Sequence, residues 1–370
     1  MSYRFPLSYT PIDEQAIGTV LRRYAGVQHA ELITDFEKEI SRITGVRYVA
    51  AVNSGTAAIH LALKALNVSS GDKVATSTFT YVASVNPILY QGAIPILIDS
   101  ESDTWNMDPE LLETALKENE PVKAIVVVHG YGVPAKMDDI LTLSRKYNVP
   151  VIEDAAEALG STYREKHLGT LADIGVLSFN NNKIITTYGG GAVLTNDEAI
   201  HKRVVHWASQ SRENKPYYEH LELGYNYRMS PLNAACGVAY LNKLPALLQG
   251  KREILNRYRN ELAKCQEITF PIDSSSASPN HWLTTILVDS RGKTVFDGDS
   301  IVKQLANGGI ETRRLWNPMH VQPLYTNAQF YSSGTSENLF KKGLCLPSGK
   351  ELSSDDISII STALIDALRV

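Results

Sequence analysis

Short apolar runs alternate with segments of helical periodicity from about residue 46 to residue 195. The runs that predict buried strands are Tyr48–Val52, Lys73–Thr76, Ile94–Ile98, Ala124–Val128, Val149–Glu153, Gly175–Ser178 and Ala192–Leu194. Between them, apolar residues recur at the spacing of one helix face in Thr56–Leu66, Pro109–Lys117 and Met137–Tyr147. This alternation predicts a largely parallel sheet covered by helices, with ligands at the carboxyl ends of its strands.

The rest of the chain predicts a second, smaller unit. The stretch from Pro231 to Lys264 is mostly helical and bridges the two parts, and Trp282–Val288 reads as a strand. Ser300–Asn307 and Ser354–Leu368 have helical patterns. Because 370 residues exceed one ordinary domain, we predict a large domain over residues 1–245, with its N-terminal segment, and a small C-terminal domain over residues 246–370.

Composition narrows the class of protein. A net charge of -4 with scattered Lys and Arg argues against nucleic acid as a partner. The sequence has no apolar run of the roughly 18 residues that a membrane helix needs, and Met1 to Pro11 lacks a signal-peptide pattern. Cysteines and histidines show no ligand spacing, so we expect no metal site, and free thiols favour a reducing compartment. We therefore expect a cytoplasmic protein.

Two charged residues follow predicted strands. Asp154 directly follows the run Val149–Glu153, at a place where an unpaired buried carboxylate would be costly. A pyridinium nitrogen would supply its partner and would stay protonated beside it, although a strand-end cap or an ordinary ion pair explains Asp154 equally well. Lys183 lies between an apolar strand and the turn Gly189–Gly191, in a stretch of Asn and Thr. That setting favours the neutral amine that Schiff-base formation needs; the alternative is a solvated surface lysine.

The segment Asn53–Ala58 follows a strand and opens a helix. Its small residues and the free N–H groups of a helix start suit a phosphate, and a simple N-cap is the alternative. It is not a Walker loop, and no GxGxxG follows a strand. Phosphoryl transfer and NAD chemistry therefore have no motif in this sequence.

Several segments together resemble the DegT/DnrJ/EryC1/StrS family of sugar aminotransferases. They are Asn53–Ala58, Thr78–Val82, Glu153–Ser161, Ser178–Gly191, Gly224–Ala235 and Arg313–Pro323. The family consists of pyridoxal 5'-phosphate (PLP) enzymes of fold type I. The resemblance implies an α/β fold with a large domain, built on a mostly parallel seven-stranded sheet flanked by helices, and a smaller C-terminal α/β domain. It also implies transamination, with pyridoxamine phosphate as the intermediate form of the cofactor.

The resemblance also implies roles for the cofactor site. Lys183 would hold PLP as a Schiff base and then move the proton between substrate and cofactor, and Asp154 would pair with the pyridine nitrogen. Tyr81 would stack on the ring, unless it is an ordinary aromatic at a helix start. Glu157 stands where many relatives carry Gln or His near the phenolic oxygen, so it would be protonated or aimed elsewhere. The positions expected at the phosphate are Ser54, Gly55, Thr56 and Ser178.

The remaining matches concern the partner subunit and the substrate. Asn226, in Gly224–Ser230, would reach the cofactor phosphate of a second copy in a homodimer with shared active sites; a plain loop capped by Ser230 fits as well. The expected substrate contacts are Arg228, Arg313, Trp316 and His320. Asn317 stands where lysine is common.

The segment Asn182–Gly191 resembles the subgroup that aminates UDP-linked 4-keto-6-deoxy-N-acetylhexosamines. It implies transfer of the amino group of L-glutamate to C4 of a nucleotide-linked keto sugar, for surface polysaccharide or glycan biosynthesis. A sugar 3-aminotransferase on the same scaffold, a PLP-binding protein without turnover, and an α/β domain without PLP are the alternatives.

Overall fold

A large sheet forms the centre of the protein. The computed structural model describes residues 3–8, 12–26, 29–272, 275–289 and 297–369. Within them, eight strands pair in the order β1-β9-β8-β5-β4-β2-β3-β14. Their bounds are β1 Tyr48–Val52, β2 Lys73–Ser77, β3 Ile94–Ile98, β4 Ala124–Val128, β5 Val151–Asp154, β8 Ile174–Ser178, β9 Gly191–Thr195 and β14 Gln329–Tyr331. Strand β9 runs antiparallel to both neighbours and the other pairs are parallel, which confirms the predicted sheet.

The seven predicted strands are all present, and β14 is an eighth that the sequence pattern did not indicate. It is three residues long and its side chains are exposed or half-buried, so it carries no continuous apolar run. It pairs with β3 at the edge of the sheet. The expected seven-stranded sheet is thus corrected to eight strands, because a short edge strand needs little apolar sequence to form.

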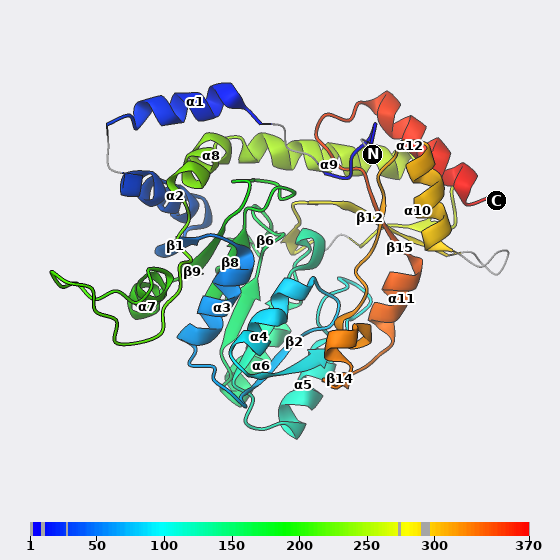
Figure 1. Cartoon of the computed structure of the whole chain (residues 1–370). Helices are drawn as coiled ribbons and strands as arrows, with labels where there is room; N and C mark the ends of the chain where they lie inside the picture. Colours follow the sequence, from blue (N-terminus) through cyan, green and yellow to red (C-terminus); the bar gives the residue numbers. More distant parts are fainter. Residues whose placement is uncertain (1–2, 9–11, 27–28, 273–274, 290–296, 370) are drawn as a thin grey trace.

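Helices cover both faces of this sheet (Figure 1). One face packs against α3 (Gly55–Ala65), α4 (Asn86–Tyr90) and α7 (Glu198–Ala208). The other packs against α2 (His29–Thr44), α8 (Pro231–Leu241), α5 (Pro109–Glu118) and α6 (Met137–Tyr147). Strand β1 illustrates the alternation, since Val52 faces the first core and Ala51 faces the second.

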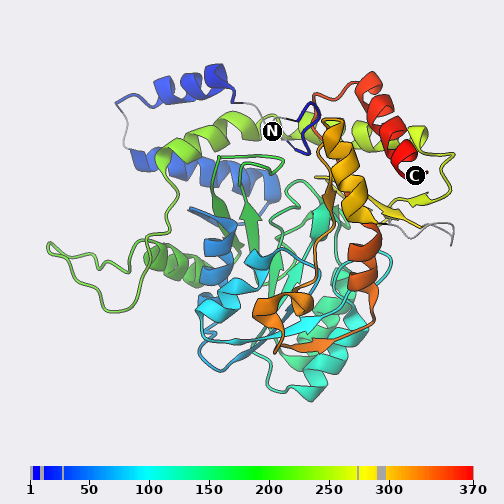
Figure 2. The ribbon, with the colours of Figure 1, turned by 45° about the vertical axis from the view of Figure 1, so that its right-hand side comes forward.

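A smaller antiparallel sheet lies beside the large one (Figure 2). Its order is β10 (Ile268–Thr269), β12 (Thr284–Val288), β15 (Gly343–Leu346) and β13 (Arg313–Arg314). The helices around it are α9 (Leu244–Glu261), α10 (Gly298–Asn307), α11 (Thr335–Lys342) and α12 (Ser354–Ala367). A separate core joins α9, α10 and α12 to this sheet, so the predicted strand and helices of the C-terminal part are confirmed.

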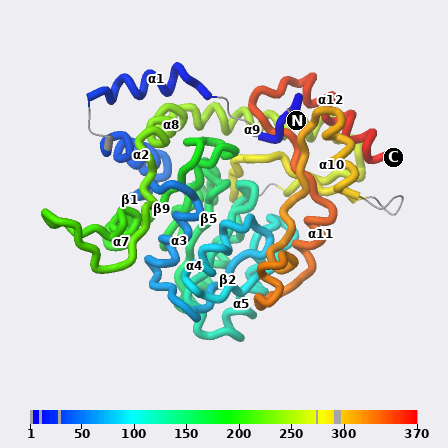
Figure 3. The backbone as a smooth tube through the Cα atoms, in the orientation of Figure 1, coloured from blue at the N-terminus to red at the C-terminus, as the bar shows by residue number. Residues whose placement is uncertain are grey.

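The two parts exchange segments. The N-terminal residue Phe5 lies in the core of the smaller part and bridges to Ile310. Figure 3 shows the N-terminal segment near α9, α10 and α12. Conversely, β14 joins the large sheet, and β11 (Ala277–Ser278) pairs with β6 (Thr162–Tyr163), which in turn pairs with β7 (Lys166–His167). The predicted boundary between residues 245 and 246 falls inside α9 and stays a prediction. No helix among the described residues is both long and apolar enough to cross a bilayer.

Candidate active site

A cavity of about 660 Å³ lies at the carboxyl ends of the large sheet's strands. Val128, Asp154 and Ser178, at the ends of β4, β5 and β8, are among the residues that line it. Trp282 and Arg313 line it from the smaller part of the chain. The cavity therefore occupies the place where the alternating strands and helices predict a ligand.

Asp154 is a buried carboxylate with two donors. It is 4% exposed, Ser84 Oγ donates to Oδ2 at 2.6 Å, and the Ala156 amide donates to Oδ1 at 3.1 Å. Burial raises the pKa of Asp154, while the hydrogen bonds from Ser84 and Ala156 and the charge of Lys183 oppose that rise. A cation placed in the cavity next to this carboxylate would offset its desolvation.

Lys183 enters the same cavity from the loop between β8 and β9. Its amide donates to the Asn180 carbonyl at 3.0 Å, and its side chain is only 13% exposed. Burial rules out the alternative of a solvated surface lysine. The ammonium group meets Glu157 Oε1 at 3.1 Å and lies 4.2 Å from the centre of the Trp282 ring. Lys183, in the loop after β8, and Asp154, at the end of the neighbouring strand β5, thus face one cavity.

Glu157 is aimed at two donors. Oε1 accepts from Lys183, and Oε2 accepts from the Tyr131 amide at 2.9 Å. The side chain is 8% exposed, and burial raises its pKa while the charge of Lys183 lowers it. The sequence analysis expected Glu157 to be protonated or aimed elsewhere than at the phenolic oxygen of the cofactor. In the structure its two oxygens contact the Lys183 ammonium and the Tyr131 amide.

The start of α3 forms the opposite end of the cavity. Ser54 caps the helix, since its Oγ accepts from the Ala57 amide at 3.1 Å, and it also lines the cavity with Gly55 and Thr56. The N-cap interpretation of this segment is confirmed, and the phosphate interpretation stays a prediction. The backbone approaches closely here, because a Cβ on Gly55 would lie 3.0 Å from Ser178 Cβ. The first N–H groups of a helix have no partner within it and attract a phosphate.

Some of the other predicted residues line the cavity, and the rest lie outside it. Tyr81 is 61% exposed and lines the cavity, as do Arg313 and Trp316. Asn226 is exposed and lies outside this cavity, where its carbonyl accepts from Asn53 Nδ2 at 3.2 Å.

Arg228 and His320 do not line the cavity either. Arg228 Nη1 is 3.3 Å from Glu37 Oε1. His320 Nδ1 is 2.8 Å from Thr78 Oγ1, and its ring stacks on Phe330 at 3.7 Å.

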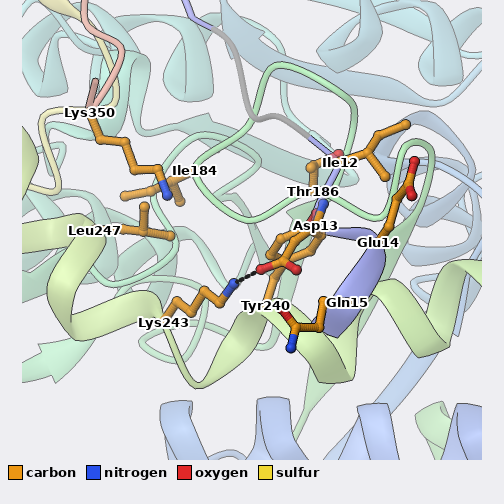
Figure 4. A pocket seen from close by; sticks show the side chains of 10 residues that line it. All are labelled: Ile12, Asp13, Glu14, Gln15, Ile184, Thr186, Tyr240, Lys243, Leu247 and Lys350. Carbon is orange, nitrogen blue, oxygen red and sulfur yellow. Dashed lines mark hydrogen bonds and ion pairs between the residues drawn. The ribbon is translucent and has the colours of Figure 1, made fainter. Parts of the chain in front are cut away.

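A second cavity of about 480 Å³ is lined by residues of the N-terminal segment, of the loop after Lys183 and of α8 and α9 (Figure 4). Ile184 and Thr186 line it together with the ion pair of Asp13 and Lys243. Asp13 and Lys243 already pair with each other, and the cavity contains neither Asp154 nor Lys183. We therefore assign the cofactor to the larger cavity.

The residues of the larger cavity fit PLP. Its volume lies in the range of small-molecule sites, and it holds a buried carboxylate, a buried lysine and a helix start in one space. When bound, PLP supplies a protonated ring that acts as an electron sink for a carbanion formed beside it. Among the described side chains, no group of three His, Cys, Asp or Glu is placed to bind a metal ion.

Comparison with known proteins agrees with this geometry. The family model described as the DegT/DnrJ/EryC1/StrS aminotransferase family matches residues 12–365. The chain belongs to this family. It is therefore a PLP-dependent sugar aminotransferase of the DegT/DnrJ/EryC1/StrS type.

Individual relatives match most of the length of this chain. EpsN of Bacillus subtilis (strain 168), provisionally named a pyridoxal phosphate-dependent aminotransferase, is 46% identical over 88% of this chain and 85% of its own. The GDP-perosamine synthase of Escherichia coli O157:H7 is 37% identical over 90% and 89%. The structure of PseC from Helicobacter pylori, an aminotransferase involved in the biosynthesis of pseudoaminic acid, superposes with a TM-score of 0.89, 25% identity and 99% coverage of both chains.

Among the residues of this aminotransferase's cavity that the sequence analysis did not identify are Tyr131, Ser84 and Trp282. Tyr131 follows the carboxyl end of β4, which was a usable signal, and its ring stacks on Trp316 with centroids 4.3 Å apart. Ser84 ends a short 3-10 helix, and Trp282 lies two residues before β12 of the smaller part. Neither position has a local pattern that indicates a site, because tertiary packing alone brings it to Asp154 or Lys183.

Proposed function

We propose that this sugar aminotransferase moves the amino group of L-glutamate to the keto carbon, at C4, of a nucleotide-linked keto-deoxy sugar, with UDP as the nucleotide. The product would serve surface polysaccharide or glycan biosynthesis. The observation that carries the proposal is the convergence of Lys183 and Asp154 on one cavity. The segment Asn182–Gly191, which resembles the UDP-sugar subgroup, supports the choice of substrate.

In this proposal the two charged residues act at opposite ends of the cofactor ring. Asp154, fixed by Ser84 and Ala156, keeps the pyridine nitrogen protonated by opposite-charge stabilisation. Lys183 would hold the cofactor covalently and would then, once displaced, carry the proton away from the α-carbon of glutamate. In the second half-reaction it returns a proton to the sugar carbon that receives the amine. The reaction is ping-pong, since glutamate leaves as 2-oxoglutarate before the sugar binds.

The cofactor phosphate would sit at the start of α3. The residues proposed to hold it are Ser54, Gly55, Thr56 and Ser178, with Asn226 from a second copy of the chain. Tyr81 is exposed toward the cavity and would cover the ring face. Arg313 and Trp316 line the cavity from the smaller part and would contact the nucleotide sugar. A guanidinium suits its phosphates, and the stacked pair of Trp316 and Tyr131 offers an aromatic surface.

A homodimer with shared sites and a cytoplasmic location complete the proposal. The segment between α7 and α8 projects from the body (Figure 1). It also exposes large apolar side chains. They are Tyr217, Tyr218, Leu221 and Leu223, each at least 60% exposed. Such a patch on a projecting segment fits contact with a second copy. The three cysteines are free, as expected in a reducing compartment.

A GDP-linked sugar is the second candidate, because a GDP-perosamine synthase is 37% identical to this chain. A panel of UDP- and GDP-linked 4-keto and 3-keto sugars separates the candidates. Each would be incubated with enzyme, PLP and glutamate, and the amino product read by mass spectrometry. We expect product from the UDP-linked 4-keto sugar. Product from a GDP-linked or 3-keto substrate alone would replace the proposed one. Cofactor absorbance that is indifferent to glutamate would reject turnover.

A further inference from the structure

Three acidic and three basic side chains line the larger cavity, within the part of the chain that the structure describes. The acidic ones are Asp154, Glu157 and Glu311, and the basic ones are Lys183, Arg313 and Arg314. Both substrates of the proposed reaction are anions, since glutamate carries two carboxylates and a nucleotide-linked sugar carries a diphosphate. A basic side chain with free donors is the group that binds such anions.

Two of the three basic side chains are already committed to other partners. Lys183 is the proposed anchor of the cofactor, and its ammonium contacts a carboxylate. Arg314 donates through Nη1 to Asp299 Oδ1 at 2.8 Å and through Nη2 to the Phe340 carbonyl at 2.6 Å. Its guanidinium also lies 4.5 Å from the centre of the Phe340 ring, and its side chain is only 18% exposed. These contacts leave Arg313 as the basic side chain that can receive an anion.

Arg313 differs from Arg314 in both exposure and partners. Its side chain is 66% exposed, and its Nη2 donates to Glu311 Oε1 at 2.8 Å. Among the described residues, Glu311 is the hydrogen-bond partner of this guanidinium. Because a guanidinium has five N–H donors in a planar fork, most of the fork stays available to a ligand. Carboxylates and phosphates match such a fork with two parallel hydrogen bonds.

Glu311 fixes the place of this guanidinium. Its side chain is 16% exposed, and its second oxygen, Oε2, accepts from the Leu7 amide at 3.0 Å. The Glu311 amide in turn donates to the Phe5 carbonyl at 2.9 Å. Thr312 is buried between the two charged residues, so Glu311 and Arg313, which both line the cavity, share the other side of the chain. The guanidinium is therefore held at the cavity wall by a carboxylate that is itself anchored.

We infer that Arg313, held in place by Glu311, is one anion site that serves both half-reactions. It binds the side-chain carboxylate of the amino donor in the first half-reaction and the diphosphate of the nucleotide-linked sugar in the second. The inference rests on the proposed function, which names these two substrates. Because 2-oxoglutarate leaves the cavity before the sugar binds, one guanidinium can serve both ligands in turn. The two ligands then exclude each other, and the donor must be an acidic amino acid.

The test measures binding to the full chain loaded with PLP, and not turnover. The donor probe is 2-methyl-L-glutamate, which binds through its amine but has no α-proton to lose, and 2-methyl-L-glutamine is the same probe with a neutral side chain. UDP and GDP are each compared with their nucleosides. Cofactor absorbance reports the affinity for the amino acids, and calorimetry reports the affinity for the nucleotides. The wild type should prefer the charged member of each bound pair about tenfold or more, because hydrogen bonds to charged groups are the stronger ones.

Substitutions at Arg313 connect the two preferences. Arg313→Gln should erase both, and Arg313→Lys, which keeps the charge, should retain part of each. Arg42→Gln is the matched control, because Arg42 is also 66% exposed, donates to Glu39 Oε2 at 2.9 Å and lies outside the cavity. It should leave both preferences unchanged. In the wild type, with no substitution at all, the nucleotide that binds should compete with 2-methyl-L-glutamate. Thermal melting confirms that each variant is folded.

Failure of the inference and failure of the proposed function give different results. If Arg313→Gln erases one preference alone or neither, the shared anion site is wrong and the proposed substrates stand. Nucleotide binding that is the same with and without 2-methyl-L-glutamate would also overturn the sharing. If the wild type itself prefers no charged probe, or if 2-methyl-L-glutamate leaves the cofactor absorbance unchanged, the proposed function is rejected instead.

Discussion

Ser84 Oγ lies 2.6 Å from Asp154 Oδ2, and the two residues are 70 positions apart in the chain. Both are buried, and Thr80 Oγ1 lies 2.7 Å from the same serine oxygen. Since Ser84 has one proton and donates it to Asp154, Thr80 donates to Ser84. This short relay begins in the segment that carries Tyr81 and ends on the carboxylate proposed to face the pyridine nitrogen.

Removing the middle of that relay should weaken the cofactor site. Ser84→Ala deprives the Asp154 carboxylate of a donor, and hydrogen bonds to charged groups contribute about 1.5–3 kcal/mol. We expect PLP affinity to fall about tenfold or more in a titration followed by absorbance. Ser77→Ala is the control, because Ser77 is equally buried and its Oγ has no hydrogen-bond partner among the described residues. Equal affinity in both variants would contradict the role given to Ser84.

Replacing Lys183 in the larger cavity and replacing Lys243 in the second cavity should have different effects on turnover. Loss of a proton-transferring group costs about 10²–10⁴-fold in rate, and Lys183 is also the proposed anchor. Lys183→Ala should therefore lose more than about 10⁴-fold in turnover, measured as 2-oxoglutarate release. Lys243→Ala breaks the ion pair with Asp13 in the second cavity and should retain near-normal turnover. The reverse result would move the active site to the second cavity.

Asp154→Asn should stabilise the cofactor-free protein while it abolishes activity. Because burial raises the pKa of Asp154 in the folded state, the folded protein binds this proton more tightly than the unfolded chain does. The charged carboxylate therefore lowers stability at neutral pH, and this cost disappears as pH falls through the raised pKa. Urea unfolding should give a higher stability for the variant at neutral pH, and the two curves should converge in acid. A less stable variant at neutral pH would refute this account.

Position 191 requires glycine because the backbone of Ser54 approaches it closely. A Cβ there would lie 2.4 Å from the carbonyl carbon and oxygen of Ser54, at the start of α3. Gly191→Ala should cost about 1–3 kcal/mol of unfolding free energy, as overpacking does, and should weaken PLP binding. Gly250→Ala is the matched change in helix α9, where a Cβ would have its nearest neighbour at 4.0 Å. It should be neutral or stabilising by up to about 1 kcal/mol in the same denaturation assay.

The projecting segment between α7 and α8 predicts the oligomeric state. Leu221 and Leu223 are 75% and 70% exposed there. Replacing both by Ser should raise the monomer fraction in sedimentation at low concentration, because apolar burial is the main driving force of association. The same change at Ile272, which is 70% exposed on the smaller part, should leave sedimentation unaltered. A wild-type monomer would remove the proposed sharing of sites.

Local sequence alone determined most of the sheet and the centre of the site. Buried parallel strands need continuous apolar runs, so the bounds of β1, β3 and β4 could be read directly from the sequence. Asp154 and Lys183 were found for a related reason. A buried charged residue next to such a run is costly unless it has a partner, and strand ends meet at one edge of the sheet, where a ligand can be that partner.

Only the tertiary structure decided which side chains surround those two residues. Ser84 reaches Asp154 and Trp282 reaches Lys183 across long stretches of chain, and no periodicity encodes contacts of that kind. It also placed Arg228 and His320 against Glu37 and Thr78, outside the cavity where the sequence expected them. The physical reason is that apolar patterning fixes which face of an element is buried. The partner of a polar side chain depends on how the elements pack together.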